Sequence, residues 1–406
     1  MPGNGPNAVK RPPQKRIPRE RLAGGRGVRK PLSWCALFAR NTVLKRAPLF
    51  EGCAACPDRL QPLAARFPVL SSSGFPVPEF PVDAVYTWVD GADPALAAKR
   101  AKYLPPQERR AWESHGPSLY RDNHELRYSL RSLAAYAPWV RHIFIATDGQ
   151  VPAWLNTEHE KIRIVDHRKF IPHEYLPTFS SRPIEAHLHR IPGLAEQYIF
   201  LNDDFFLAAP CGKETFFTAN GLPVLFTDWR QSRLDGFANP KSPHTHSHAN
   251  VRAYMEARGI SPAPMVATTH APYAQTLTNA RAAYDFFQDA VCKFSHNKFR
   301  TTNDMVFYCH AIPLLAYAKK RAVPCDAPFY YINTKRFDRR AHYEALLRQK
   351  NLPCQVPFFC CNDVGNRPWT NAWRRDLADF LQSYYPEPSP FERRESAVAM
   401  LPGGAN

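Results

Sequence analysis

Two adjacent carboxylates are the residues of this chain best suited to chemistry. Asp203 and Asp204 follow Asn202 and lie between the apolar runs 198–201 and 205–207. Two neighbouring charges among buried side chains are costly unless a partner neutralises them. Mg²⁺ commonly takes one or two carboxylates together with phosphate oxygens. We therefore expect Asp203 and Asp204 to act with a divalent cation, Mg²⁺ or Mn²⁺, that bridges a diphosphate.

Three other aspartates also end apolar runs. Asp90, Asp148 and Asp166 stand at, or just after, the end of a predicted strand. Ligands of open α/β sheets bind outside the carboxyl ends of the strands, so these side chains could join the pair. Aspartate is also a common turn former. For Asp148 and Asp166 taken singly, the turn is the interpretation that we favour.

The elements that must position these residues alternate between strands and helices. Apolar runs predict strands over 82–89, 142–147, 161–165 and 197–201, with a weaker one over 224–227. The spacing of Leu126, Leu130 and Leu133 predicts a helix over 123–137, with Asp122 as its N-cap. Further helices are predicted over 184–190, 284–291, 304–318 and 373–384. This alternation predicts an α/β fold with a largely parallel sheet flanked by helices.

The polar segment 232–250 is expected to be a long loop that covers the substrate. It contains His244, His246 and His248, whose alternate spacing fits no common catalytic zinc motif. Cys360 and Cys361 are expected to line a strand. Cys53 and Cys56 have the spacing of metal ligands but lack a second pair at zinc-ribbon distance.

The composition predicts a globular protein with flexible ends. With 406 residues and 44% hydrophobic residues, the chain can form one large or two ordinary domains. We expect residues 1–81 to be a basic arm and linker rich in Pro and Gly, 82–386 the catalytic domain, and 387–406 a flexible tail. The formal net charge of +17 fits an anionic partner, which could be nucleic acid, an acidic membrane or phosphorylated sugars. The arm could contact anionic lipid or nucleic acid, or be a solvated tail.

The sequence predicts a cytoplasmic location, with peripheral contact at the inner membrane as an option. No run reaches the ~18 apolar residues of a spanning helix, and the N-terminus lacks the apolar core of a signal peptide. The ten cysteines are irregularly placed, unlike a secreted disulfide framework.

The chain resembles the Stealth proteins in four blocks that occur in the order of that family. The first block reads Asp-Ala-Val-Tyr-Thr-Trp-Val-Asp-Gly over residues 83–91, and the second runs from Arg121-Asp122-Asn123 to Asn-Asp-Asp-Phe at 202–205. The third contains Thr-His-Ala-Pro-Tyr at 269–273 with Phe-Arg at 299–300, and the fourth contains Cys-Cys-Asn-Asp at 360–363. The resemblance covers about residues 83–386.

This resemblance implies a fold like that of nucleotide-sugar transferases and a defined reaction. A hexose 1-phosphate would pass from a nucleotide diphosphosugar to a hydroxyl of an acceptor glycan, with release of the nucleoside monophosphate. Bacterial members of the family act in capsule or exopolysaccharide synthesis. The chain departs from the family at Ser180, where Asn is frequent, and at Arg182-Pro183, which puts the acceptor specificity in doubt.

The resemblance also implies roles for individual residues. Asp204 is the favoured catalytic carboxylate, His270 would be the base or bond the transferring phosphate, and Arg300 would hold phosphate oxygens. The candidates for binding the metal are Asp203, Asp204, Asn362 and Asp363. The candidates for binding the nucleotide are Trp88, Asp90, Gly91, Arg121, Asn123 and Arg127. Trp88 could equally be a core residue, and either Arg127 or Arg131 could simply be solvated.

Two other functions remain open at this point. A metal-dependent glycosyltransferase would use the same strand-end carboxylates but release a nucleoside diphosphate. A basic nucleic-acid-binding protein is disfavoured, because Lys and Arg outside the N-terminal arm are dispersed and no binding motif is present. We therefore expect no nucleic-acid partner.

Overall fold

The computed structural model describes residues 78–104, 116–228, 243–260, 267–325, 329–352, 356–363 and 370–393. Nearly all of the predicted basic arm lies outside these ranges, as do Cys53, Cys56 and the segment 232–242. The predicted domain boundaries therefore stay predictions at the N-terminal end.

A five-stranded sheet forms the centre of the fold, in the order β3-β2-β1-β4-β8. The strands β1, β2, β3 and β4 are parallel, and β8 pairs with β4 in antiparallel orientation. These strands are β1 (Val82–Thr87), β2 (Ile143–Thr147), β3 (Ile162–Asp166), β4 (Gln197–Asn202) and β8 (Tyr273–Thr276). The four predicted main strands are thus confirmed, and the largely parallel α/β fold with them. Most residues of β1, β2 and β4 are buried because helices and loops cover both faces of the sheet.

A second sheet begins where the chain leaves β4. Strand β5 (Phe205–Leu207) follows β4 after Asp203 and Asp204 and pairs with β11 (Phe358–Asn362), which in turn pairs with β10 (Phe329–Asn333). The two carboxylates therefore lie where the chain passes from one sheet to the other. Cys360 and Cys361 lie in β11, as predicted. A third sheet joins β6 (Val224–Asp228), the predicted weak strand, to β7 (Ala267–Thr268) and β9 (Val323–Cys325).

Each predicted helix has a counterpart in the structure, but the ends differ and further helices are present. Helix α5 (Glu125–Tyr136) begins two residues later than predicted, because His124 before it has a left-handed φ of 67°. The predicted helix 284–291 is split between α8 (Leu277–Phe286) and α9 (Gln288–Ser295). The others are α6 (Ser181–His187), the π-helical turn η10 (Phe307–Ala311) with α10 (Ile312–Ala318), and α12 (Asn371–Tyr384). Helices α3 (Pro94–Ala101) and α11 (Arg339–Gln349) were not predicted.

The predicted loop over 232–250 is wrong for its described part, which belongs to helix α7 (Pro243–Glu256). Pro243 occupies the first helical position, where its missing N–H is tolerated. Val251 and Met255 lie one helical turn apart, and both are fully buried. Their packing, which begins just after the predicted loop, stabilises a helix that its polar first half does not indicate.

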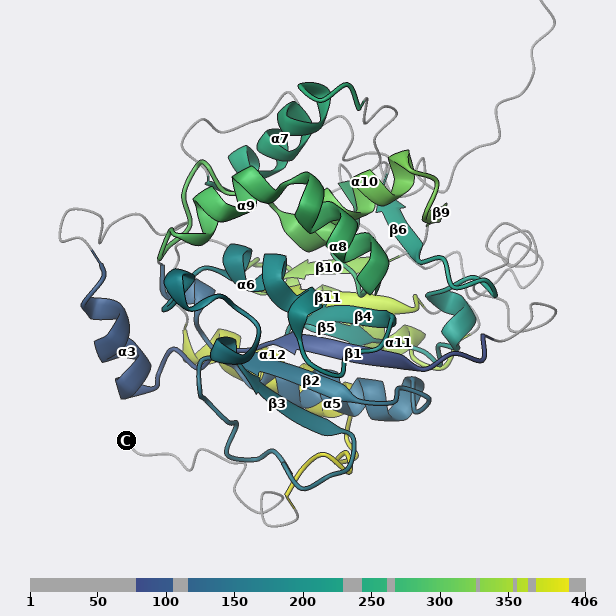
Figure 1. The fold of residues 1–406 in the computed structure, drawn as a ribbon. Coiled ribbons are helices and arrows are strands. Elements are labelled where there is room, and N and C mark those ends of the chain that lie inside the picture. The colour runs from purple at the N-terminus through teal and green to yellow at the C-terminus, as the bar shows by residue number, and fades with distance from the viewer. Residues whose placement is uncertain are drawn as a thin grey trace, which may run out of the picture. The chain divides into compact units, whose positions relative to one another are not determined.

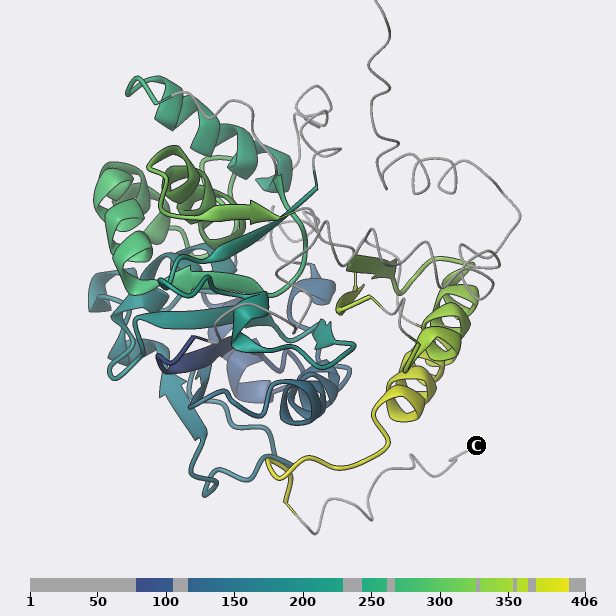
Figure 2. The ribbon, with the colours of Figure 1, turned by 90° about the vertical axis from the view of Figure 1, so that its right-hand side faces the viewer.

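The helices divide between two regions of the molecule. Helices α8, α9 and α10 lie near the β8 edge of the main sheet (Figure 1), whereas α11 and α12 lie together on another side (Figure 2). Helices α11 and α12 bury aromatic residues against the second sheet, and the rings of Tyr343 and Phe380 stack at 4.3 Å. None of the described helices has the length and apolar character that a membrane crossing requires.

Candidate active site

The carboxylates singled out from the sequence lie at the junction of the two sheets. The backbone N–H of Cys361 in β11 donates to the carbonyl of Asp204, at 3.1 Å. This bond fixes the turn at Asp203 and Asp204 beside the carboxyl end of β11, where Asn362 and Asp363 follow. The candidates from the second and fourth sequence blocks are therefore neighbours.

Two further acids accompany this pair and change its protonation. Burial, followed by repulsion from Asp204, Glu125 and Asp122, raises the pKa of Asp203 well above its ordinary value. Burial also raises the pKa of Asp204. Burial, followed by repulsion from Asp122, raises the pKa of Glu125 to about 8. Four acids thus share one partly buried place, and a bound cation would relieve their mutual repulsion.

The arrangement around Asp204 fits a bound cation. Its Oδ1 is buried and has no hydrogen-bond partner among the described residues. Its Oδ2 accepts a weak bond from the thiol of Cys360, at 3.4 Å, and the side chain of Asn362 also bonds this carboxylate. An unpaired buried carboxylate oxygen is costly, and a cation would remove that cost. Asp203 and Asp204 are thus suited to hold a divalent ion.

Asn362 and Asp363 are engaged with other side chains. Asp363 forms ion pairs with Arg121 at 2.5 Å and with Lys335 at 2.6 Å. The Nδ2 of Asn362 lies 3.1 Å from Nε2 of His270. Asp363 could bind a cation only by exchanging one of these partners, so the geometry favours a role in holding Arg121 and Lys335 at the edge.

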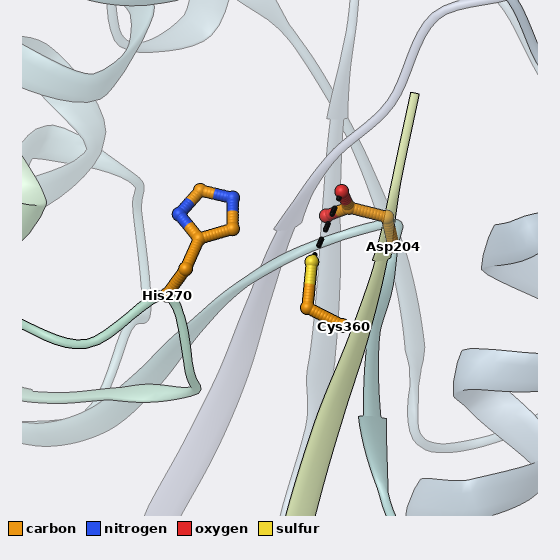
Figure 3. Close-up of side chains that lie close together, drawn as sticks. All are labelled: Asp204, His270 and Cys360. Carbon is orange, nitrogen blue, oxygen red and sulfur yellow. Dashed lines mark hydrogen bonds between the residues drawn. The ribbon is translucent and has the colours of Figure 1, made fainter. Parts of the chain in front are cut away.

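His270 faces the carboxylate of Asp204 across the site (Figure 3). A nitrogen of its imidazole, an oxygen of Asp204 and the sulfur of Cys360 all lie within 4.8 Å of one another. Burial lowers the pKa of His270 below 6.5, with a smaller lowering from Arg182, while Asp204 and Glu185 raise it. The ring is therefore neutral near neutral pH and can accept a proton.

Two arginines, Arg182 and Arg300, lie close to each other, and the charge of Arg182 also acts on His270. Nη2 of Arg300 donates to Oγ of Ser181 at 3.1 Å, and Arg182 forms an ion pair with Glu185 at 3.5 Å. Burial, followed by the charge of Arg182, lowers the pKa of Arg300 to about 10. At this pKa the guanidinium of Arg300 is still charged near neutral pH, and Glu185 and Asp304 are the carboxylates whose charges act on it. This side of the site is suited to an anion.

Three of the six candidates for the nucleotide site line one cavity. Its volume is about 360 Å³, in the range of small-molecule sites. The guanidinium of Arg100 lies 3.6 Å from the centre of the Tyr120 ring. The lining residues are Asp90, Gly91, Ala92, Arg100, Tyr120, Arg121, Asp122 and Arg374. Asp90, Gly91 and Arg121 were predicted here, whereas Arg100, Tyr120 and Arg374 were missed.

Arg127 is not brought to this cavity. It is buried and forms an ion pair with Glu392, which also accepts bonds from Arg131 at 2.7 and 2.9 Å. Both arginines are thus structural, and neither is solvated. The packed chain also continues past residue 386, because Glu392 is buried.

The remaining candidates have local roles. Trp88 is a core residue, 8% exposed. Asn123 holds the carboxylate of Glu125 through its backbone N–H and side-chain amide, at 2.6 and 2.8 Å. Asp166 accepts a bond from the backbone of Arg168, which makes it a turn former, as favoured from the sequence. Asp148 pairs with Lys99.

The structure adds residues that sequence reasoning missed. Tyr331 lies in β10, a strand that was not predicted, and Lys335 lies in the turn after this strand. Tyr331 is 43% exposed, and its ring centre lies 5.9 Å from that of His270. Arg182 had a signal in the sequence, since it departs from the family pattern at the start of α6.

A parallel α/β sheet with carboxylates, an imidazole and arginines at the ends of its strands is the architecture of a group-transferring enzyme, and the protein is a transferase. Its sequence matches the models of Stealth protein conserved region 1 over residues 80–105, conserved region 2 over 119–225 and conserved region 4 over 352–399. It is 36% identical over 310 residues to a capsular polysaccharide phosphotransferase of Actinobacillus suis, a match that covers 75% of this chain and 82% of that protein. The chain belongs to the Stealth family.

Two further similar proteins are a relative in sequence and a solved structure. An exopolysaccharide phosphotransferase of Streptomyces coelicolor is 35% identical over 391 residues, which cover 96% of this chain but only 60% of that protein. The galactosyltransferase LgtC is similar in structure, with a TM-score of 0.39 and 13% identity over 74% of this chain and 95% of that one.

Proposed function

We propose that the protein transfers a hexose 1-phosphate from a nucleotide diphosphosugar, such as a UDP-sugar, to a hydroxyl of an acceptor glycan. The bond formed joins the acceptor oxygen to the phosphorus next to the sugar, and the bond broken is that of the pyrophosphate. The nucleoside monophosphate leaves. The observation that carries this proposal is the neutral imidazole of His270, which lies close to Asp204 and is also affected by the charge of Arg182.

His270 is the proposed general base. Its lowered pKa keeps the ring neutral, so it can take the proton of the acceptor hydroxyl as that oxygen attacks. The Nδ2 of Asn362 lies 3.1 Å from Nε2 and, as a donor, occupies the lone pair of that nitrogen, so the acceptor hydroxyl would have to displace this amide. Asp204, whose charge acts on the ring, would stabilise the imidazolium that forms.

Arg300 is proposed to hold the transferred phosphoryl group. Its fork of N–H donors matches phosphate oxygens, and the hydroxyl of Ser181 at 3.1 Å limits its movement. Arg182, whose charge acts on Arg300, adds a second positive charge. Together the two arginines favour the negative charge that develops on the phosphoryl oxygens.

Asp203 and Asp204 are proposed to hold Mg²⁺ or Mn²⁺. When bound, such an ion would neutralise the diphosphate and the departing monophosphate. Arg121, fixed by Asp363 at 2.5 Å, lines the nucleotide cavity and is placed to contact the same diphosphate. The acids would thus contact the diphosphate of the donor through the metal ion, and Arg121 would contact it directly.

Tyr331 is proposed to hold the acceptor sugar. The exposed ring lies next to His270, and an aromatic face offers an apolar surface to the C–H side of a sugar ring while its hydroxyl stays available for a hydrogen bond. Its place across from the donor side would direct an acceptor hydroxyl toward the imidazole.

We further propose that this reaction serves capsule or exopolysaccharide synthesis, as the names of the relatives indicate for those proteins. Nucleotide sugars are made in the cytoplasm, so the enzyme would act there or at the inner face of the membrane. The described cysteines are all free thiols, which is consistent with a reducing compartment.

The experiment that tests this function measures nucleotide release from a panel of UDP-sugars in the presence of Mg²⁺ and an acceptor glycan. UMP should be formed only with acceptor, and its formation should fall by a factor on the order of 10² or more in both Asp204→Asn and His270→Ala. The matched control is His246→Ala, a histidine of α7 with no proposed role. Release of UDP would instead indicate a glycosyltransferase.

A further inference from the structure

We propose that Asp204, His270 and Cys360 form a binding site for a thiophilic cation of the Zn²⁺ type, and that its occupation inhibits the transferase. The inhibition rests on the proposed function, whereas the binding does not. No such role for Cys360 follows from the reaction described above, which uses no thiol.

The geometry brings three different donor atoms to one point. A carboxylate oxygen, an imidazole nitrogen and the thiol sulfur lie within 4.8 Å of one another (Figure 3). With bonds of about 2.0–2.3 Å to zinc, ligand atoms of a tetrahedral site are on the order of 3.5 Å apart. The sulfur of Cys360 and Oδ2 of Asp204 already lie 3.4 Å apart. Only the imidazole needs a small rotation to complete the set.

The side chains are held in these places by separate elements. Cys360 lies within β11, paired with Phe205 of β5 and Tyr331 of β10. His270 packs edge-on against the ring of Phe205, with centres 4.8 Å apart. Because the strand fixes the thiol and the neighbouring ring fixes the imidazole, the cost of ordering the ligands has largely been met by folding.

The donor set selects the kind of cation. Mg²⁺ prefers oxygen ligands in octahedral geometry and does not use a thiol. Zn²⁺ accepts sulfur, nitrogen and oxygen in a tetrahedral site, and three protein ligands leave its fourth position open. Sulfur and nitrogen therefore distinguish this site from the one proposed for Mg²⁺ on Asp203 and Asp204.

Binding replaces the thiol proton by the metal. Cys360 is fully buried, and burial with the nearby charge of Asp204 raises its pKa well above the ordinary value. Without a cation the sulfur thus carries a proton, which it donates to Asp204. On binding, this proton is released to solvent and the thiolate becomes a ligand.

Inhibition follows from the shared residues. A cation held by Asp204 and His270 would occupy the lone pair of the proposed base and one carboxylate of the proposed magnesium site. The acceptor hydroxyl could then not transfer its proton to the imidazole, and Asp204 could not bind Mg²⁺.

The neighbouring Cys361 provides a matched control. Successive side chains of a strand point to opposite faces, and the two cysteines accordingly belong to different core clusters, Cys360 beside Phe358 and Cys361 beside Phe359. Both thiols are fully buried. Replacement of either cysteine by serine makes the same chemical change, but only Cys360→Ser removes a proposed ligand.

The test is a titration of the metal-free, full-length protein with Co²⁺, which reports a thiolate ligand by a sulfur-to-cobalt charge-transfer band in the near ultraviolet. Cys53 and Cys56 are replaced by serine throughout, so that their metal-like spacing cannot contribute. We expect one equivalent of Co²⁺ to give the band, Zn²⁺ to abolish it, and Cys361→Ser to keep it. In Cys360→Ser and His270→Ala the band should be lost or require at least about tenfold more Co²⁺.

A band of equal strength in Cys360→Ser, or none in the parent protein, would overturn the site. Circular dichroism of each variant separates loss of a ligand from loss of folding. Activity is measured separately: Zn²⁺ should inhibit in the presence of excess Mg²⁺, and Cys360→Ser should need at least about tenfold more Zn²⁺ for half inhibition. Equal inhibition of both would overturn the inhibitory role, whereas a protein that binds Co²⁺ through Cys360 but releases no UMP would contradict only the proposed function.

Discussion

At the scale of single residues, the charged side chains of the site fall into two halves of opposite sign, and the imidazole of His270 is neutral. Asp122, Glu125, Asp203 and Asp204 form one half, and burial with mutual repulsion disfavours their charged forms. Arg182 and Arg300 form the other half, at the N-terminal end of α6 and before η10. A substrate that carries both a metal-bound diphosphate and a transferable phosphoryl group would match both halves at once.

The pH dependence of the reaction should report the protonation of His270. Its neutral form is the proposed base, so kcat/KM should rise with pH and level off, with the acid midpoint below the ordinary 6.5. Protonation, and with it loss of activity, occurs as the pH falls through this lowered pKa. Rate measurements across the acid range check the midpoint.

Two matched variants decide whether this midpoint belongs to His270. Arg182→Gln removes a charge that lowers its pKa and should move the midpoint up, whereas Glu185→Gln removes a charge that raises it and should move the midpoint down. Shifts in the same direction, or none, would contradict the assignment of the base.

Tyr331 should determine the affinity for the acceptor. We expect Tyr331→Ala to raise the acceptor KM by about tenfold, as for the loss of an aromatic contact of 1–1.5 kcal/mol, and to leave the donor KM unchanged. Tyr331→Phe keeps the ring and should behave almost as the parent protein does. Tyr317→Ala serves as the control, because Tyr317 is similarly exposed, at 38%, but lies on α10. An unchanged acceptor KM in Tyr331→Ala would refute this role.

At the scale of elements, the segment after β1 forms the cavity proposed for the nucleotide by a close approach of two backbones. The N–H of Gly91 donates to the carbonyl of Tyr120 at 2.6 Å. A Cβ at position 91 would lie 2.5 Å from that carbonyl oxygen and 2.6 Å from the Cβ of Tyr120. Only glycine allows this contact, because the atoms it would meet are backbone atoms or close to them.

Gly91→Ala should therefore open the cavity. We expect the donor KM to rise by about tenfold and the protein to lose about 1–3 kcal/mol of stability, the usual cost of overpacking. Steady-state kinetics and urea unfolding measure the two effects. Ala92→Gly, at the next residue of the cavity, is the control for a general loosening of this turn, and a normal donor KM in Gly91→Ala would argue against a nucleotide here.

The C-terminal segment is tied to helix α5 by a buried ionic group. Glu392 pairs with Arg127 and Arg131, which are 3% and 5% exposed. Removal of one partner of a buried pair leaves the other charge uncompensated and costs about 3–5 kcal/mol. A chain ended after residue 386 should lose at least this much, and a chain ended after Arg393 should keep it. Chemical denaturation compares the two, and equal unfolding midpoints would contradict a structural role for Glu392.

At the scale of the whole molecule, the sequence predicted what depends on local pattern. Apolar runs identified the strands of the main sheet, and Asp203 and Asp204 were found because two charges interrupt such a run. The polar segment that ends in α7 was interpreted as a loop, since its helix depends on the burial of Val251 and Met255 against distant residues.

Contacts between distant segments explain what was missed. Lys335 and Tyr331 reach the site because β10 pairs with β11, and neither strand reveals its partner in the sequence. Arg127 lies at a helix start that looks favourable for phosphate, but Glu392, 265 residues later, determines its position. The family resemblance supplied the candidate roles of the residues. The structure was needed to show that Arg121 lines the cavity whereas Arg127 is buried in the interior.

The central claim concerns which bond of the donor breaks. A UDP-sugar labelled with ³²P at the phosphate next to the sugar can be incubated with the protein, Mg²⁺ and acceptor glycan, and the label followed. We predict that the label enters the glycan in a phosphodiester while unlabelled UMP is released, and that Asp204→Asn stops both. Label that remains in released UDP, with unphosphorylated sugar in the glycan, would contradict sugar-phosphate transfer and identify the protein as a glycosyltransferase.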